Sequence, residues 1–265
     1  MIMSFRKKIT TEVKHFLTKS NISDEKILTN EDIQHLPAPV IKWLHLSGAV
    51  GRKKPKNVWM QQSFKLKLKP DQKKWYQSKS TQIISAALPS FIWMLRLNMA
   101  PMVTILGRDK LDDGKGEMQM NLYGVFNILK EKGEKIDEGT LQRYLGETVW
   151  MPSAVISPYI TWKETDHQSA EAILSYKGIT ASGKFFFNEN GHFYKFETHR
   201  YKENLPDSKR LKWVIVAREH HEMDGIVIPT LLDVTWHLEE GPWTWSILKV
   251  EKLKYNVTKN PKPLF

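Results

Sequence analysis

The pair of residues best suited to ligand chemistry is Arg143 and Glu147, near the middle of the chain. A spacing of four residues places both side chains on one face of a helix, with Trp150 beside them. Arginine before glutamate is the less favoured order for an exposed helical pair, which contributes only about 0.2–0.5 kcal/mol, so stability is a weak reason for this pair. A guanidinium and a carboxylate flanked by Tyr144 and Trp150 suit contact with the polar headgroup of a ligand. An ordinary surface ion pair is the alternative.

The segment around this pair predicts a short helix over residues 138–151. Asp137 can cap its beginning, and Pro152 disfavours helix at the residue before it. One face is largely apolar, and it is formed by Leu141, Tyr144, Leu145, Thr148 and Val149. Because the opposite face carries Arg143, Glu147 and Trp150, the helix has two faces suited to contact, whereas a surface helix needs only one. This pattern indicates a helix covered on both sides.

A second group of polar residues occupies positions 218–224, with Asp233 and His237 further along the chain. Histidines beside carboxylates can bind zinc or iron, or transfer protons. On a strand, however, His220, His221 and Glu222 lack the i, i+4 geometry of the helical zinc-protease motif. A solvated strand end near a hairpin explains them better. With no cysteine, phosphate-binding glycine loop or nucleophile elbow in the sequence, we predict no metal site and no cofactor.

The net charge of +11 favours anionic partners such as phospholipid headgroups, nucleic acid or acidic ligands. Lysines cluster in the first predicted hairpin, beside Trp59 and Trp75, which would suit nucleic acid. No nucleic-acid-binding motif accompanies them, and lysines on edge strands also prevent sheet aggregation. We therefore favour the second explanation for this cluster, which consists of Lys65, Lys67, Lys69, Lys73 and Lys74.

The first fifty residues predict a helical segment, and residues 51–265 predict one curved-sheet domain into which the helix 138–151 is inserted. Within residues 1–19, basic residues surround an apolar stripe made of Ile2, Phe5, Ile9, Val13, Phe16 and Leu17. Such a helix either lies on an anionic membrane surface or packs on the domain with solvated lysines. We favour packing. No apolar run is long enough to span a bilayer, and polar residues follow Lys8 where a secretory signal would be apolar.

From residue 56 onward a two-residue alternation dominates, separated by Asp-Gly and Asn-Gly turns. We expect an α+β fold in which about eleven or twelve antiparallel strands form a strongly curved sheet, an open or half barrel, around the central helix. Ten tryptophans, ten methionines and eleven phenylalanines are consistent with two interpretations. They either fill a large core or line a cavity for an apolar ligand on the concave side.

Four segments together resemble a bacterial domain-of-unknown-function family, over roughly residue 30 to the C-terminus. The most specific is R-Y-L-x-E-x-V-W-x-P at 143–152, and the others lie at 36–51, 224–230 and 236–238. The resemblance implies a fold similar to the open barrels of LolA/LolB-like lipoprotein carriers, in which a sheet and helices enclose a lipid-binding cavity. Many members of the family begin with an apolar membrane segment, where this chain has its basic amphipathic stretch.

We therefore expect non-enzymatic binding or carriage of a lipid, a fatty acid or another apolar or amphipathic molecule. The predicted ligand-binding residues are Trp93, Arg143, Tyr144, Glu147, Trp150 and Trp236. An enzyme that uses Glu147 or His220, His221 and Glu222 as acid–base groups is one alternative, and a nucleic-acid-binding module is another. We expect a cytoplasmic protein, and peripheral contact between residues 1–19 and the inner face of an anionic membrane is the alternative to packing of that segment on the domain.

Overall fold

One antiparallel sheet of thirteen strands dominates the computed structural model, which describes residues 4–20 and 26–259. The strand order is β6-β5-β4-β3-β2-β1-β13-β12-β11-β10-β9-β8-β7. Every neighbouring pair therefore consists of consecutive strands except β1 with β13, and the consecutive strands β6 and β7 form the two edges. The strands before the central helix are β1 (Asn57–Leu66), β2 (Tyr76–Ser85), β3 (Ser90–Ala100), β4 (Val103–Asp112), β5 (Lys115–Leu122) and β6 (Phe126–Glu131). Those after it are β7 (Ile160–Asp166), β8 (Ser169–Tyr176), β9 (Ile179–Phe187), β10 (Phe193–Tyr201), β11 (Arg210–Met223), β12 (Ile226–Leu238) and β13 (Gly241–Tyr255).

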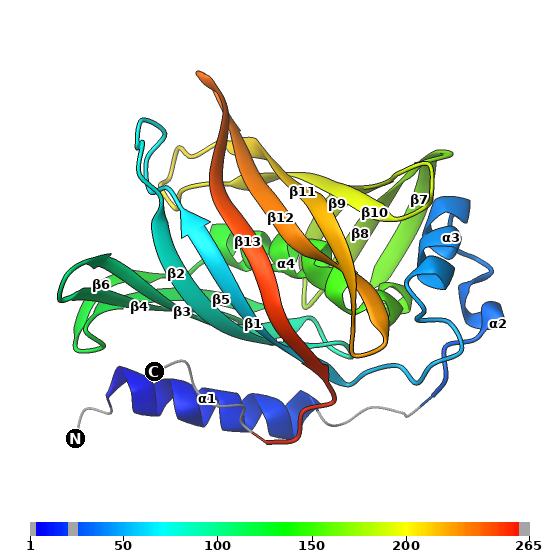
Figure 1. The fold of residues 1–265 in the computed structure, drawn as a ribbon, viewed down its shortest axis with the longest axis horizontal. Helices are drawn as coiled ribbons and strands as arrows, with labels where there is room; N and C mark the ends of the chain where they lie inside the picture. The colour runs from blue at the N-terminus through cyan, green and yellow to red at the C-terminus, as the bar shows by residue number, and fades with distance from the viewer. Residues whose placement is uncertain (1–3, 21–25, 260–265) are drawn as a thin grey trace.

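The expected α+β architecture is confirmed: the sheet curves around helix α4 (Glu134–Glu147), and further helices lie near the N-terminus (Figure 1). The sheet has thirteen strands, and the prediction of eleven or twelve missed β6. This strand has no alternation of buried and exposed side chains, and Phe126 and Ile128 are 64% and 51% exposed. A free edge strand that contacts only one neighbour carries little of the period-two signal.

The central helix begins earlier and ends earlier than predicted. Gly133, at φ 114°, precedes its first residue, and Thr148–Trp150 and Pro152–Ile156 form the 3-10 turns η1 and η2. Asp137 is therefore a buried residue within the helix, not its cap. Its carboxylate accepts hydrogen bonds from the Gly116 backbone N–H at 2.7 Å and from the Lys115 Nζ at 2.9 Å. These bonds fix the first turns of α4 to β5.

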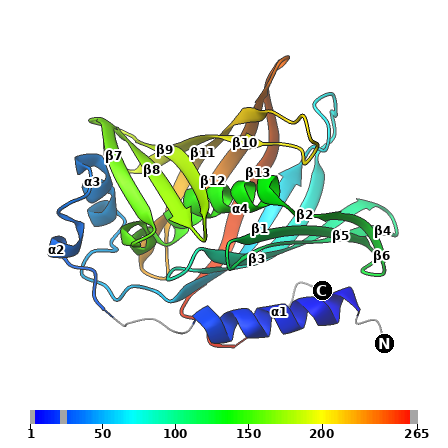
Figure 2. The same cartoon turned by 180° about the vertical axis from the view of Figure 1, so that it is seen from behind.

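Two glycines allow α4 to approach the sheet closely. Gly146 of the helix and Gly183 of β9 lie against the Phe196 ring, and a Cβ on Gly183 would come within 2.2 Å of that ring. A third glycine, Gly116 of β5, lies so close to the helix that a Cβ there would be 2.7 Å from the Ile136 carbonyl oxygen. In Figures 1 and 2 the helix accordingly lies inside the curve of the sheet, between the arm that ends in β6 and the arm that ends in β7.

Helix α1 (Phe5–Ser20) covers the outer face of the sheet, below β1–β5 in Figure 1. Its buried residues Phe5, Ile9, Val13, Phe16 and Leu17 form a separate apolar cluster with Trp59, Ile83, Ile92, Met94 and Leu106. The predicted packing of this helix on the domain is thus what the structure shows for residues 5–20, while Ile2 lies outside the described residues. None of the described helices combines the length and apolar character needed to cross a bilayer.

Short helices cover the β7 end of the sheet, where Pro37 precedes a helix and Pro39 lies in its first turn. Helix α2 (Asn30–Ile33) begins with a capping box between Thr29 and Asp32, and α3 (Ala38–Leu46) begins after Pro37. Trp43 of α3 packs on Phe187 of β9 with ring centroids 5.8 Å apart. The apolar residues of α3 therefore belong to the same core as the concave face of the sheet.

Buried ion pairs connect α1 to the sheet. The fully buried Arg108 of β4 contacts Glu12 of α1 at 3.2 Å and Glu117 of β5 at 2.7 Å. Lys8 of α1 and Lys132 also contact Glu117, at 3.2 and 2.9 Å. Burial alone would raise the pKa of Glu117, but Lys132, Arg108 and Lys8 outweigh it and hold that pKa at about 2.

Because its pKa lies below the ordinary 4.5, Glu117 stabilises the fold fully above about pH 5 and progressively less toward pH 2. We expect the substitution Glu117→Gln to remove up to about 3 kcal/mol of this pH-dependent stability. Urea denaturation between pH 6 and pH 2 measures it, with the exposed Glu189→Gln as control. Equal pH slopes for the two variants would contradict the assignment.

Candidate functional site

A cavity of about 400 Å³ lies between α4 and the concave face of the sheet. Six tryptophans line it: Trp93, Trp150, Trp213, Trp236, Trp243 and Trp245. Aliphatic and phenyl groups complete its apolar surface, from Phe64, Ile136, Val149, Ile215, Leu232, Val234 and Leu248. Both its size and its lining are those of small-molecule sites in proteins.

The polar wall of this cavity is organised by Arg143 of α4. Its Nε donates to Glu147 Oε1 at 2.7 Å and its Nη1 donates to Asp109 Oδ2 of β4 at 2.9 Å. Gln82 of β2 donates to the second oxygen of Glu147 at 2.5 Å. The guanidinium also lies 4.7 Å from the Phe91 ring centroid and 4.9 Å from that of Trp93. The pair predicted from its spacing is therefore a largely buried network that joins the helix to two strands.

Burial and the neighbouring charges shift the pKa values of the three ionisable groups in this network. Burial raises the pKa values of Asp109 and Glu147, although Arg143 opposes the change. Burial alone would lower the pKa of Arg143, but Glu147 and Asp109 outweigh it and raise that pKa. Both oxygens of Glu147 are already hydrogen-bonded, so its carboxylate is an anchor for Arg143 and Gln82.

A second arginine, Arg200 of β10, lines the same cavity without a carboxylate partner among the described residues. Its guanidinium lies 4.6 Å from the Trp213 ring centroid and 5.7 Å from that of Trp236. Its Nε is buried and makes no hydrogen bond within the described chain. Burial and the nearby Arg143 lower the pKa of Arg200 to about 10, so it is cationic at neutral pH.

Several other polar atoms of the lining have no partner within the described chain. They are the indole Nε1 atoms of Trp93, Trp213, Trp243 and Trp245, the Oγ of Ser246 and the Oδ1 of Asp109. Among the six tryptophans of the lining, Trp150 alone donates its indole N–H within the described chain, to the Pro229 carbonyl oxygen at 3.0 Å. Buried polar groups are normally hydrogen-bonded, so this concentration of unpartnered donors distinguishes the cavity from an ordinary core.

Residues 26–248 match a family of unknown function, DUF6544. The chain belongs to this family. The family membership expected from the sequence segments is thereby confirmed. No curated protein matches the chain.

Two solved structures are similar to the chain. A DUF1329 family protein from Desulfovibrio piger has 8% identity and a TM-score of 0.44, over 89% of this chain and 96% of that one. A LolA superfamily protein from Nitrosomonas europaea has 11% identity and a TM-score of 0.38, over 77% and 87%. The second belongs to the group named by the sequence resemblance. Neither likeness bears on ligand or activity.

The cavity brings together five of the six residues predicted to bind ligand: Trp93, Arg143, Glu147, Trp150 and Trp236. Tyr144 does not line it. Its ring lies in the core, 1% exposed, and its hydroxyl donates to the Ser85 carbonyl oxygen at 3.0 Å. The helical spacing that groups Tyr144 with Leu141 and Leu145 already places it on the apolar face.

Arg200 and Asp109 were not predicted as site residues, although strand alternation carries a signal for both. Arg200 lies on the same face of β10 as Phe196 and Thr198, and Asp109 lies on the same face of β4 as Leu111. Since residues two apart share a face of a strand, both charges are expected on the concave side. A charge in such a position needs a partner or a function.

The histidine group lies away from the cavity. The His220 Nε2 is 2.7 Å from the Phe193 carbonyl oxygen, and the His221 Nδ1 is 2.7 Å from Thr230 Oγ1. Burial lowers the pKa of His220, which favours its neutral form. Within residues 4–20 and 26–259, no three histidine or carboxylate side chains converge as a metal site requires.

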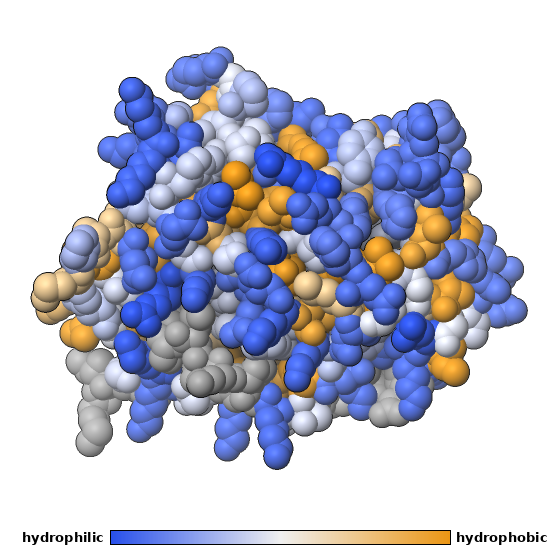
Figure 3. Space-filling view, in the orientation of Figure 1, coloured by the Kyte–Doolittle hydropathy of each residue, from blue (hydrophilic) through white to orange (hydrophobic). Residues whose placement is uncertain are grey.

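The lysine-rich hairpin between β1 and β2 lies beside the cavity. Lys67 lines it, with its Nζ 4.8 Å from the Trp75 ring centroid, and Lys65, Lys69, Lys73 and Lys74 are exposed. The face of the molecule that Figure 3 shows, in the orientation of Figure 1, is mostly hydrophilic, with hydrophobic residues scattered between polar ones. The hairpin therefore places positive charge next to the tryptophan-lined cavity.

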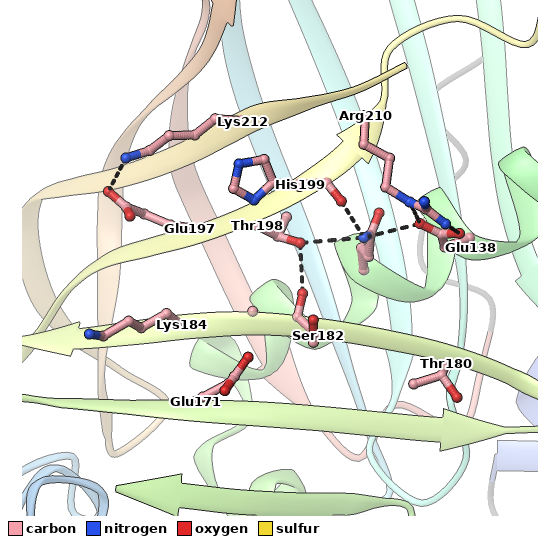
Figure 4. A pocket seen from close by; sticks show the side chains of 12 residues that line it. Glu138, Glu171, Thr180, Ser182, Lys184, Glu197, Thr198, His199, Arg210 and Lys212 are labelled. Carbon is pink, nitrogen blue, oxygen red and sulfur yellow. Dashed lines mark hydrogen bonds and ion pairs between the residues drawn. The ribbon is translucent and has the colours of Figure 1, made fainter. Parts of the chain in front are cut away.

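A second, polar pocket of about 490 Å³ lies where β9 and β10 separate (Figure 4). Their pairing ends at Lys184 and Glu197, and Gln142 of α4 donates there to the His199 carbonyl oxygen at 2.8 Å. Its charged groups are mostly paired, Arg210 with Glu138 at 2.7 Å and Lys212 with Glu197 at 3.1 Å. This pocket accordingly offers a ligand far less unsatisfied hydrogen-bonding capacity than the tryptophan-lined cavity.

The buried network predicts that Arg143→Met destabilises the protein by about 3–5 kcal/mol, because Asp109 and Glu147 lose their shared counterion. Adding Asp109→Asn and Glu147→Gln should recover much of the loss, since the buried charges are then gone. Arg210→Met, which breaks a more exposed pair, should cost at most about 1 kcal/mol. Denaturant unfolding compares the three variants, and equal losses for Arg143→Met and Arg210→Met would contradict the network.

Proposed function

We propose that this protein binds an apolar or amphipathic ligand carrying an acyl chain, such as a lipid or a fatty acid, in the tryptophan-lined cavity. The observation that carries this proposal is the apolar space enclosed between α4 and the sheet, with its row of aromatic side chains. A fully packed core would leave no room there, because protein interiors are close-packed with few voids larger than a water molecule. An apolar chain that fills the cavity gains the free energy of leaving water.

The unpartnered donors support a ligand with polar atoms as well as an apolar body. Indole N–H groups of Trp213, Trp243 and Trp245 face no acceptor within the described chain. Oxygen atoms of an ester, hydroxyl or carboxyl group would satisfy such donors, which otherwise remain costly to bury. The catalytic alternative has less support, because Glu147 is fully engaged and His220, His221 and Glu222 do not line the cavity.

Ligand carriage is tested by organic extraction and native mass spectrometry of the purified protein, followed by titration of the delipidated protein with dodecanol. We expect a co-purifying lipid of defined mass and a change in tryptophan fluorescence that saturates at one dodecanol per chain. The substitution Ser246→Phe should fill the cavity and abolish this titration, because Ser246 is fully buried in its wall.

The matched control is Ser182→Phe, which places the same ring in the polar pocket and should leave dodecanol binding unchanged. Circular dichroism confirms that both variants are folded. Equal dodecanol binding by wild type and Ser246→Phe would place the binding elsewhere and overturn the proposal.

We also propose that the protein acts in the cytoplasm at the inner membrane face, where α1 contacts anionic lipid. The outer side of α1 exposes Arg6, Lys7 and Lys14, while its apolar side is buried against the sheet. Contact of this kind is electrostatic and shallow, worth about 1 kcal/mol per basic residue near the surface. We expect co-sedimentation with vesicles containing phosphatidylserine that is lost at 0.5 M salt and in the variant R6E/K7E/K14E. Binding that persists at high salt would contradict this mode.

A further inference from the structure

We infer that Arg200 is an anion-binding residue and that the ligand of the cavity carries a carboxylate or phosphate headgroup. The inference rests on the proposed function, because it assigns a headgroup to the same ligand. It adds a residue that neither the family match nor the sequence motifs point to.

The two arginines of the cavity differ in their partners. Arg143 has two carboxylate partners, at 2.7 and 2.9 Å, and is a structural cation. Arg200 forms no ion pair among the described residues, although Asp109, Glu147 and Glu138 attract its charge from further away, and its guanidinium lies against Trp213 and Trp236. A largely desolvated guanidinium without a contacting carboxylate is unfavourable, so a site that retains one is suited to an anion supplied from outside.

Arg200 is held in a fixed orientation. Its guanidinium is stacked on Trp213 and near Trp236, and its Nη2 lies 3.2 Å from where a Cβ would stand on Gly139 of α4. The absence of a side chain at Gly139 leaves room for it. A planar guanidinium fixed in this way is preorganised to bind a carboxylate or a phosphate through two parallel hydrogen bonds.

Positive side chains outnumber negative ones around the cavity, since five basic and two acidic side chains line it. Asp109 and Glu147 both bind Arg143, and Lys202 pairs with Glu203 at 3.3 Å. The basic side chains of the lining that have no ion pair among the described residues are therefore Arg200, Lys67 and Lys135. Low-dielectric walls around such charges focus an attractive potential for anions.

The position of Arg200 in the cavity determines how the ligand would be oriented. Trp236 lies beside Arg200, and its cross-strand partner Trp243 lies 5.8 Å from the Lys202 Nζ. From Trp236 the lining continues along β12 to Val234 and Leu232, a distance of about 13 Å at 3.3 Å per residue. The headgroup would therefore lie at the Arg200 end and the acyl chain along the aliphatic end.

The test compares ligands that share one chain and differ in the headgroup. Dodecanoate, dodecyl phosphate, dodecanol and inorganic phosphate are titrated into delipidated wild type, Arg200→Gln and Arg200→Lys, with Arg210→Gln as the surface control. We expect wild type to prefer the two anionic amphiphiles over dodecanol. Arg200→Gln should weaken dodecanoate and dodecyl phosphate binding by about tenfold to a hundredfold, the range of one charge-assisted hydrogen-bonded contact, and weaken dodecanol binding far less.

Arg200→Lys should retain part of the preference, because it keeps the charge but loses the planar fork. It also serves as the readable variant if Arg200→Gln does not fold, and Arg210→Gln should behave as wild type. Equal wild-type affinities for dodecanoate and dodecanol would overturn the assignment of Arg200 while leaving the proposed function intact. Failure of both to bind would overturn the proposed function itself. Binding of inorganic phosphate as tight as that of dodecyl phosphate would show a free-anion site and overturn the headgroup assignment.

Discussion

The burial of the Arg143 guanidinium inside a curved sheet is the constraint on which the other features depend. A buried cation requires several acceptors at once, and here they come from the helix itself, from β2 and from β4. Meeting that requirement fixes the rotation of α4 about its axis, because Glu147 and Arg143 must both face the strands. With the rotation fixed, Leu141, Tyr144 and Leu145 fill the core, and Trp150 faces the cavity.

The same constraint explains why the cavity is not closed by packing. An apolar helix could settle until its side chains met the sheet everywhere, but a helix anchored by charged hydrogen bonds is held at the distance those bonds require. Glycines at positions 116, 139, 146 and 183 allow close approach between the helix and side chains or backbone of the sheet. Between these fixed contacts the tryptophans of β3, β11, β12 and β13 line the remaining space.

Much of this arrangement could be predicted from the sequence, because it rests on periodicity. The period-two alternation predicted twelve of the thirteen strands. Strand β3 also carries apolar residues on its outer face, Ile92 and Met94, because α1 covers that face. The helix pattern separated Arg143 and Glu147 from Leu141, Tyr144 and Leu145, so the spacing already placed Tyr144 on the face that packs in the core. What the sequence could not supply was pairing over long distances. The curvature of the sheet brings Asp109 and Gln82 into contact with α4. Arg200 forms no ion pair because Asp109 and Glu147 both bind Arg143, and no sequence pattern shows which arginine they bind.

The strand order has a consequence for how the chain reaches this structure. Every strand pair joins consecutive strands except β1 with β13, where Val58 lies opposite Tyr255. The sheet is thus two meanders of local hairpins joined along a single seam between its first and last strands. Local hairpins form quickly because few residues separate their strands. The pairing of β1 with β13 closes a loop of nearly the whole chain, so it has the largest entropy cost of loop closure and is expected to form late. Trp59 of β1 and Val257, just beyond β13, lie at the same end of that seam, and both contribute to the apolar cluster that α1 covers. The N-terminal helix therefore finds its complete docking surface only after the seam has closed.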